Sequence, residues 1–166
     1  MTTQDDLKDA FAGESQANRK YLAYAEQAER DGKLQVARLF RAVAAAETLH
    51  AHAHLRAMDG VKSTEVNLAD ALAGEEYEFT TMYPPMVARA KAEGHKKAER
   101  SMSQALEVEK VHHVLFKAAL DAVRAGRDLP ADALRICPVC GHTVIGEAPD
   151  SCPVCGVKGE KYTEIG

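Results

Sequence analysis

The strongest constraint on the fold is an internal repeat that runs through most of the chain. Gly13-Glu14 recurs as Gly74-Glu75, and Glu47-x-x-His50 recurs as Glu109-x-x-His112, at a nearly constant offset. The matched residues are carboxylates and imidazoles rather than core apolar residues. Repetition of ionisable positions predicts two similar halves that share one site.

Apolar residues recur at helical spacing in four stretches that are rich in helix-forming residues. We expect helices at about residues 5–30, 36–59, 67–93 and 94–125. Gly32 and Gly94 mark the turn inside each pair of helices, and Pro84-Pro85 should kink the third helix. The pattern predicts an all-α four-helix bundle made of two hairpins.

The repeated carboxylates are expected to lie at one level of this bundle. Residues three apart on a helix share a face, so each Glu-x-x-His pair can point inward. Glu14 and Glu47 lie at similar distances, ~25 Å, from the turn between them. Glu75 or Glu78 and Glu109 do the same around the second turn. Four helices thus present a Glu, a Glu-x-x-His, a Glu and a Glu-x-x-His, the ligand set of di-iron carboxylate bundles.

The chemistry of this ligand set favours a pair of iron ions. Several carboxylates buried together repel one another and lose hydration, so they require cations between them. Two ferrous ions carry about the charge of four carboxylates. Oxygen ligands suit both ferrous and ferric iron, and one imidazole per ion adds affinity, so a carboxylate-bridged site can change oxidation state without being rebuilt.

All four cysteines lie in two Cys-x-x-Cys-Gly knuckles, which begin at Cys137 and Cys152. In a reducing compartment such a cluster binds metal more often than it forms disulfides. The pattern is a strong signal for a tetrahedral four-thiolate site, and each following glycine can adopt a positive φ that turns backbone N–H groups towards the sulfurs. The spacing alone leaves zinc and iron open, and in isolation it favours a zinc ribbon.

The segment between the helices and the knuckles is a polar Gly/Pro linker, residues 124–130. Helical periodicity does not resume after it. We expect a helical domain at residues 1–128 and a second domain at 132–166. The second is too short to build its own apolar core, so a metal must hold it together.

Charge and hydropathy exclude several classes of protein. The formal net charge is −4 and basic residues are not clustered, which argues against nucleic acid or an acidic membrane as a partner. Charges interrupt every long apolar stretch, so we expect no transmembrane span. The N-terminal residues lack the basic start and apolar middle of a signal peptide, and we expect a cytoplasmic protein.

The motifs resemble those of the rubrerythrin family, in that family's order and over essentially the whole chain. They are the segment 11–17, the two Glu-x-x-His pairs, and Gly74-Glu75-x-x-Glu78 followed by Met82-Tyr83-Pro84. The resemblance implies a ferritin-like bundle with a small β-rich rubredoxin-like module at its C-terminus. It also implies the iron ligands: Glu14, Glu47, His50, Glu75, Glu109 and His112 for the di-iron site, and Cys137, Cys140, Cys152 and Cys155 for a single iron.

Three further residues are predicted to act at the di-iron site. The resemblance implies that Glu78 binds one iron in the oxidised state and yields to His50 on reduction. Tyr21 shares a helix face with Glu14, so its hydroxyl is expected to bond a carboxylate beside the metal ligands; the alternative for Tyr21 and Tyr83 is a core aromatic residue with a solvated hydroxyl. Tyr83 resembles a second family tyrosine near the metals. Of the other histidines, His54 can reach the face of His50, and we expect the rest to be solvated: His52, His95, His113 and His142.

The resemblance implies a peroxidase that reduces hydrogen peroxide to water in defence against oxidative stress. Electrons would come from NAD(P)H through a separate reductase, or from a rubredoxin, by way of the four-cysteine iron. The sequence does not name the donor, fix the oxidant or decide the loaded metal. Two alternatives are ferritin-like iron oxidation and storage, and a metal-binding protein with a structural zinc ribbon.

We also expect a homodimer with swapped helix pairs. In this fold family the second and third helices run parallel, so within one bundle their connection must return ~30 Å to bring the carboxylates level. The eight steps from about Asp59 to about Asn67 reach at most ~27 Å. Continuing the third helix into a neighbouring chain removes that strain.

Overall fold

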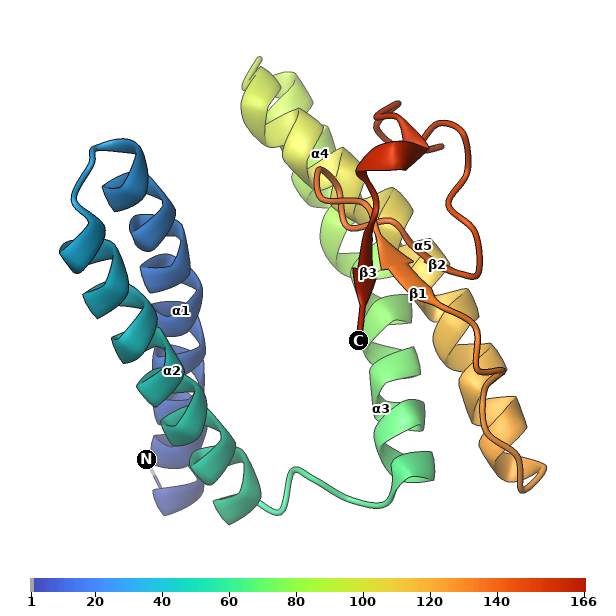
Figure 1. Ribbon diagram of the computed structural model, residues 1–166. Coiled ribbons are helices and arrows are strands. Elements are labelled where there is room, and N and C mark those ends of the chain that lie inside the picture. The colour runs from blue at the N-terminus through green and yellow to red at the C-terminus, as the bar shows by residue number, and fades with distance from the viewer. Residues whose placement is uncertain (1) are drawn as a thin grey trace. The chain divides into compact units, whose positions relative to one another are not determined.

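The computed structural model describes residues 2–166, and the chain divides after Lys62 into two compact units. Figure 1 shows their elements. The first unit is a hairpin of α1 (Thr3–Arg30) and α2 (Leu34–Ala57). The second contains α3 (Thr64–Tyr77), a π-helical turn η1 (Glu78–Met82), α4 (Tyr83–Ala92), α5 (Lys96–Arg124) and a small sheet. Among the described residues no helix is long and apolar enough to cross a membrane.

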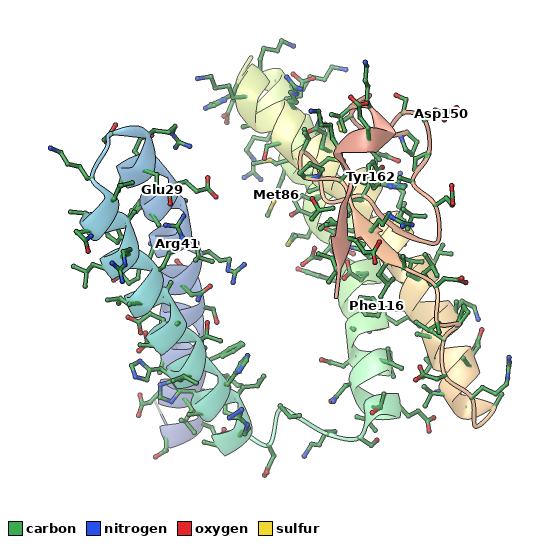
Figure 2. All side chains as sticks on the ribbon, viewed as in Figure 1. Glu29, Arg41, Met86, Phe116, Asp150 and Tyr162 are labelled. Carbon is green, nitrogen blue, oxygen red and sulfur yellow. The ribbon has the colours of Figure 1, made fainter. Side chains whose placement is uncertain are left out.

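Small side chains hold the first hairpin together. Ala25, Ala28 and Ala37 form a buried cluster near the turn, where the absence of larger side chains lets the two helix backbones approach closely. The turn itself uses Gly32 at φ +69°, a conformation that favours glycine. An ion pair between Glu29 of α1 and Arg41 of α2, 2.8 Å apart, closes the exposed edge (Figure 2).

A buried amide fixes the register of the first hairpin. The Asn18 side chain on α1 is 6% exposed and donates to the Ala44 carbonyl at 2.6 Å and to the Thr48 hydroxyl at 2.8 Å, both on α2. A buried amide without partners would be costly, so these bonds favour one alignment of the two helices. Asn18 lies one turn after Glu14 and Thr48 follows Glu47, so the bonds act at the level of those carboxylates.

The third predicted helix is interrupted rather than simply kinked at its prolines. The structure ends α3 at Tyr77, inserts the π turn η1 from Glu78, and begins α4 with prolines in its first turn. Proline lacks an N–H and its ring clashes with the carbonyl four residues earlier, so the regular α-helical ladder cannot continue through Pro84-Pro85. The wider π turn accommodates the break just before the prolines, and its first residue is Glu78.

The second hairpin, α3 against α5, is fixed by a histidine. The His113 Nδ1 lies 3.3 Å from the Leu72 carbonyl, which can only accept, so Nδ1 carries the proton. The ring also meets Phe79 edge-to-face at 5.4 Å. The expectation that His113 is solvated was therefore wrong. His95 is exposed as expected, and its side chain also caps α5 by accepting from the Ala98 amide.

The C-terminal module is a three-stranded antiparallel sheet. Strand β1 (Leu134–Ile136) lies between β2 (Thr143–Ile145) and β3 (Thr163–Ile165), and a short 3-10 turn, η2 (Gly159–Lys161), precedes β3. Ile136 of the central strand pairs with Thr143 on one side and Thr163 on the other. The first cysteine knuckle connects β1 to β2, so the sheet holds it at one end.

Candidate metal centres

The first hairpin brings together one half of the predicted ligand set. Glu14 of α1 and Glu47 and His50 of α2 each offer a ligand atom, and these atoms all lie within 4.8 Å of one another. His50 Nδ1 is 3.0 Å from a Glu47 oxygen. The two carboxylates are half-buried, whereas His50 is exposed. His54 is not part of this group.

The second hairpin repeats the arrangement. Glu75 of α3 and Glu109 and His112 of α5 also place ligand atoms within 4.8 Å of one another. His112 Nδ1 is 2.8 Å from Glu109 and 3.8 Å from Glu75. All three side chains are half-buried. The predicted sharing of a helix face by Glu and His at three-residue spacing is thus found in both hairpins.

The carboxylates of the second group are electrostatically crowded. Burial raises the pKa of Glu75 to about 7, with further contributions from a hydrogen bond with Glu109 and from repulsion by Glu109 and Glu78. Burial and the charge of Glu109 also raise the pKa of Glu78, against the opposing effect of His112. Carboxyl groups this close share protons unless a cation lies between them, and a divalent cation fits this donor set.

Glu78 and Tyr83 lie beside this group rather than within it. Glu78 is the first residue of the π turn, and Tyr83 is the residue directly after it. Burial raises the pKa of the Tyr83 hydroxyl, and the negative charges of Glu78, Glu109 and Glu75 raise it further. The hydroxyl therefore stays protonated close to all three carboxylates. Single π turns of this kind occur frequently at functional sites.

Tyr21 takes part in an aromatic cluster. Its ring lies 6.3 Å from that of Tyr24 and 6.1 Å from that of Phe40, measured between centroids. Within residues 2–62 its hydroxyl makes no hydrogen bond to a carboxylate. The predicted bond from Tyr21 to a carboxylate beside the metal ligands stays a prediction.

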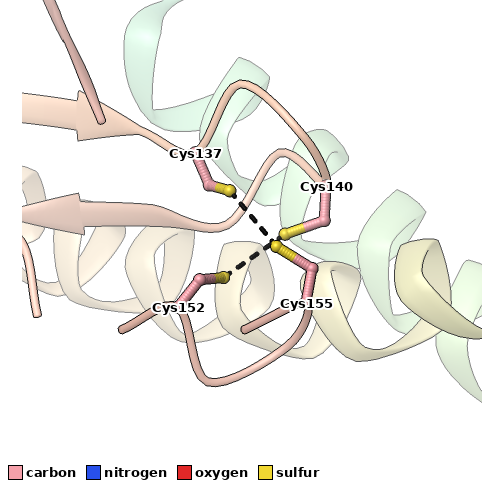
Figure 3. A group of neighbouring side chains, drawn as sticks. All are labelled: Cys137, Cys140, Cys152 and Cys155. Atoms are coloured by element: carbon pink, nitrogen blue, oxygen red, sulfur yellow. Dashed lines mark hydrogen bonds between the residues drawn. The ribbon is translucent and has the colours of Figure 1, made fainter. Parts of the chain in front are cut away.

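The four cysteines converge on one point (Figure 3). Cys137 and Cys155 have sulfurs 3.6 Å apart, and those of Cys140 and Cys152 are 3.5 Å apart. These separations exclude disulfides. They are close to the ~3.8 Å edge of a tetrahedron whose metal–sulfur bonds are ~2.3 Å. The geometry fits a single tetrahedral ion, and it is compatible with either iron or zinc.

The two knuckles have matching backbones. Gly141 and Gly156 adopt φ of +86° and +76°, as expected for the residue after each second cysteine. Each donates its N–H to the carbonyl of the first cysteine of its knuckle, at 3.0 and 2.9 Å. Cysteine side chains at equivalent positions are also alike in burial, since Cys137 and Cys152 are buried and the second cysteine of each knuckle is half-exposed.

The pKa of one thiol in the module, that of Cys152, is lowered. Burial raises the pKa of Cys152, but hydrogen bonds from the Tyr162 hydroxyl and from backbone N–H groups outweigh it and lower the pKa to about 6. The Tyr162 hydroxyl lies 2.9 Å from His142 Nδ1, so it can accept from the ring while donating to the sulfur. The expectation that His142 is solvated was wrong. A thiol of this kind is readily available as a metal ligand.

A hydrogen bond joins the module to the second carboxylate group. His112 Nε2 lies 3.3 Å from the carbonyl of Gly141, the residue after Cys140, and 3.2 Å from Thr143 Oγ1. The carbonyl can only accept, so Nε2 carries a proton, and Nδ1 is the ring nitrogen that faces Glu109 and could bind a metal. The Thr143 hydroxyl in turn donates to the same carbonyl at 3.0 Å.

This contact restrains the ring of His112 on the side away from the carboxylates. The ring of His50, the other predicted histidine ligand, has no equivalent contact within residues 2–62. Histidine ligands of metals commonly donate their second N–H to a carbonyl, which sets tautomer and orientation. His112 has that partner. Within residues 2–62 the ring of His50 bonds only to Glu47. Sequence reasoning missed Gly141 and Thr143, because nothing in the local pattern signals a contact 29 to 31 residues away.

Comparison with known protein families agrees with the geometry of both sites. The chain matches the rubrerythrin family over residues 5–120 and the rubrerythrin rubredoxin-like domain over residues 136–163. The second match covers both cysteine knuckles, and the first covers all six predicted carboxylate and histidine ligands.

Individual relatives match over nearly the full length. Rubrerythrin-2 of Clostridium acetobutylicum is 37% identical, covering 96% of this chain and 95% of the relative. Nigerythrin of Nitratidesulfovibrio vulgaris is 36% identical, covering 98% and 86%. A solved structure of fully reduced, all-ferrous nigerythrin superposes with a TM-score of 0.60 at 32% identity, covering 99% of this chain and 87% of the other. The expected fold class, a four-helix bundle followed by a small sheet with a four-cysteine cluster, is confirmed. The chain belongs to the rubrerythrin family and carries that family's rubredoxin-like domain at its C-terminus.

Proposed function

We propose that the chain is a non-haem di-iron peroxidase that reduces hydrogen peroxide to water in defence against oxidative stress. The reaction consumes two electrons and two protons for each peroxide and yields two waters. The observation that carries the proposal is the position of His112, which faces the carboxylate group through Nδ1 and the cysteine knuckle through Nε2. An iron-storage function leaves this contact, and the cysteine module, without a role.

The proposed ligands follow from the two groups of side chains. Glu14, Glu47, His50, Glu75, Glu109 and His112 would hold a carboxylate-bridged iron pair, and the four cysteines would hold one iron. When bound, the iron pair supplies two electrons to peroxide, and the four-thiolate iron returns them one at a time. The nigerythrin structure in an all-ferrous state supports iron as the metal.

The residues around these ligands would have distinct tasks. Glu78 would add a carboxylate that balances the higher charge of an oxidised iron pair, and would give way to His50 when the pair is reduced. The exposure of His50 and its single partner support that movement, whereas the clamp on His112 supports a fixed ligand. Tyr83, held protonated beside the carboxylates, can donate a hydrogen bond or a proton as the O–O bond breaks.

We propose that the complete site forms in a homodimer with swapped helix pairs. Each hairpin supplies only three of the six ligands. With the helix ends of the structure, bringing Glu47 and Glu75 level in parallel helices requires a return of ~31 Å along the bundle. The seven steps from Ala57 to Thr64 reach ~25 Å fully extended, which is shorter than the required return. The difference is larger with these helix ends than with the ends expected from the sequence.

Complementation between two inactive chains tests the swap. One chain carries Glu14→Ala and Glu47→Ala, and the other carries Glu75→Ala and Glu109→Ala. In a swapped heterodimer one of the two sites receives wild-type hairpins from both chains, so refolding the mixture should restore metal binding and activity. If the hairpins of each chain pair with one another, every site carries a lesion and the mixture stays inactive.

The proposed donor is a rubredoxin, or a separate NAD(P)H-linked reductase, in the reducing cytoplasm. The four free thiols suit such a compartment. The central experiment is anaerobic: iron-loaded, fully reduced protein is mixed with limiting peroxide in a stopped-flow spectrometer. We expect oxidation of both iron centres with one peroxide consumed per two electrons. A colourless module would support structural zinc, and faster oxidation by dioxygen with many irons retained per chain would support storage.

A further inference from the structure

A groove lies where the first turns of α5 pass the first cysteine knuckle. Its volume is about 370 Å³, and its lining includes Lys97, Arg100, Ser101 and Gln104 of α5 together with Val139 and Cys140. All of these residues belong to the second unit. None of them is a predicted di-iron ligand, and of these residues only Cys140 belongs to a group of candidate metal ligands, the four cysteines.

The groove gives access to the half-exposed side of the four-thiolate site. Cys137 and Cys152 are 1% and 2% exposed, so a partner cannot approach the site through them. Cys140 is half-exposed and lines the groove. Beside it the Val139 side chain is 53% exposed, an apolar contact surface next to a thiolate. The equivalent valine of the other knuckle, Val154, is less exposed.

Two unpaired cations stand at the edge of the groove. Lys96, Lys110 and Lys117 of the same helix each pair with a carboxylate within 3.0 Å. Lys97 and Arg100 are exposed, and within residues 2–166 their side chains form no hydrogen bond or ion pair. The N-terminus of α5 adds positive potential at the same place. Because the whole chain has a net charge of −4, this edge is a local reversal of charge.

We propose that this groove is the docking surface for an acidic one-electron carrier protein. The inference rests on the proposed function and specifies where its electron donor binds. A single four-thiolate iron changes by one electron, so a hydride donor, which transfers two, does not match it directly. In the docked complex the carrier would lose one electron, and a ferric ion held by the four cysteines would gain it. Two such encounters supply the electrons for one peroxide.

Charged and apolar residues of the groove would have different roles in docking. Carboxylates on the carrier would be attracted to Lys97 and Arg100, which raises the association rate and orients the approach. Val139 would then pack against the carrier and exclude water next to Cys140. From there the Gly141 carbonyl leads directly to His112 Nε2, so the groove and the carboxylate group lie at opposite ends of one short covalent and hydrogen-bonded path.

Charge reversal tests the surface against a matched control. The test protein carries Lys97→Glu and Arg100→Glu. The control carries Lys91→Glu and Arg127→Glu, which change the net charge equally at exposed positions outside the groove. Binding of an acidic rubredoxin is measured by NMR on zinc-loaded protein, and reduction of the ferric module by the same rubredoxin is followed by stopped-flow. At low salt we expect the test variant to lose about tenfold in affinity and rate and the control less than about threefold. Near 0.5 M salt the difference should disappear.

A second pair of variants tests the apolar contact. Val139→Ser should weaken binding of the rubredoxin, and Val154→Ser, at the equivalent position of the other knuckle, should not. The inference is overturned if both charge variants behave alike, if neither changes binding, or if Val154→Ser has the larger effect. The proposed function is judged separately, by the reaction of chemically reduced wild-type protein with peroxide. If that reaction fails while rubredoxin binds normally, the proposed peroxidase function is refuted and the proposed docking surface is not.

Discussion

Replacing Thr143 with Val tests the contact between His112 and the cysteine module, which joins two candidate metal centres. The substitution keeps the β-branched shape that suits strand β2 and removes only the hydroxyl. His112 Nε2 then loses its acceptor at 3.2 Å and keeps the Gly141 carbonyl at 3.3 Å, which itself loses the hydroxyl that donates to it at 3.0 Å. The ring of His112 should become less well oriented while the backbone of the module is unchanged.

The expected size of the effect follows from the bonds removed. A neutral hydrogen bond contributes ~1 kcal/mol net, and loss of a partner behind a histidine ligand typically lowers metal affinity by ~10 to 100-fold. Because one acceptor remains, we expect a loss near the lower limit, ~10-fold or ~1.4 kcal/mol, at the half-site of Glu75, Glu109 and His112. The half-site of the first hairpin should keep its affinity.

Two measurements and a matched control decide the outcome. Competition with a metal chelator gives the affinity for ferrous or cobaltous ions, and ¹⁵N NMR of the metal-free protein gives the tautomer of His112. The control is Thr163→Val, which makes the same change opposite the same residue, Ile136, on the other edge of β1. If both variants leave the tautomer and the affinity equal to those of the wild type, the contact does not orient His112 in solution.

Four further changes probe other parts of the structure. Asn18→Leu should lower the free energy of unfolding by ~1–2 kcal/mol in urea denaturation, since the two bonds from its side chain to α2 are lost; an unchanged midpoint would contradict the role of the amide. In metal-free protein the pKa of Glu75 is raised from 4.5 to about 7, so its contribution to stability is present below pH 4.5 and lost as the pH rises through 7. Urea midpoints of wild type and Glu75→Gln should therefore diverge over that range, and parallel curves would argue against it. Glu78→Ala should retain both irons but slow peroxide turnover, and normal turnover would remove its assigned task. Cys152→Ser should spare the single reaction of pre-reduced protein with peroxide and abolish turnover with an external donor; if turnover survives, the module is not the electron route.

The side chains that gather in the candidate metal sites could be predicted because they follow short sequence rules. Glu-x-x-His places two ligands on one helix face, and Cys-x-x-Cys-Gly determines a knuckle whose glycine takes a positive φ. Both are local, and both are repeated, which separates them from chance. The sequence therefore predicted the members of the three groups of side chains that the structure brings together.

The residues that orient these groups were not predictable in the same way. Asn18 looks like any polar residue on a helix until the helix opposite is placed, and His113 looked solvated because its partner is a backbone carbonyl on α3. Two prolines predicted a distortion of the third helix, yet whether it would be a kink or a π turn depends on packing against α5. Such contacts join positions far apart in the chain, and a local sequence pattern cannot predict them.

The two halves of the repeat differ in the contacts that restrain their candidate ligands. The ligands are the same in both halves, but the restraints on them differ. In the first hairpin a buried amide fixes the helices and leaves the ring of His50 exposed with one partner. In the second, the helices are fixed by His113 and the ring of His112 is held on its far side by the module. The proposed exchange of Glu78 and His50 would need one ligand that can move and one that cannot. The ring bonded to the cysteine knuckle is the restrained one, so under the proposed function electrons would arrive at the half whose ligand geometry is held.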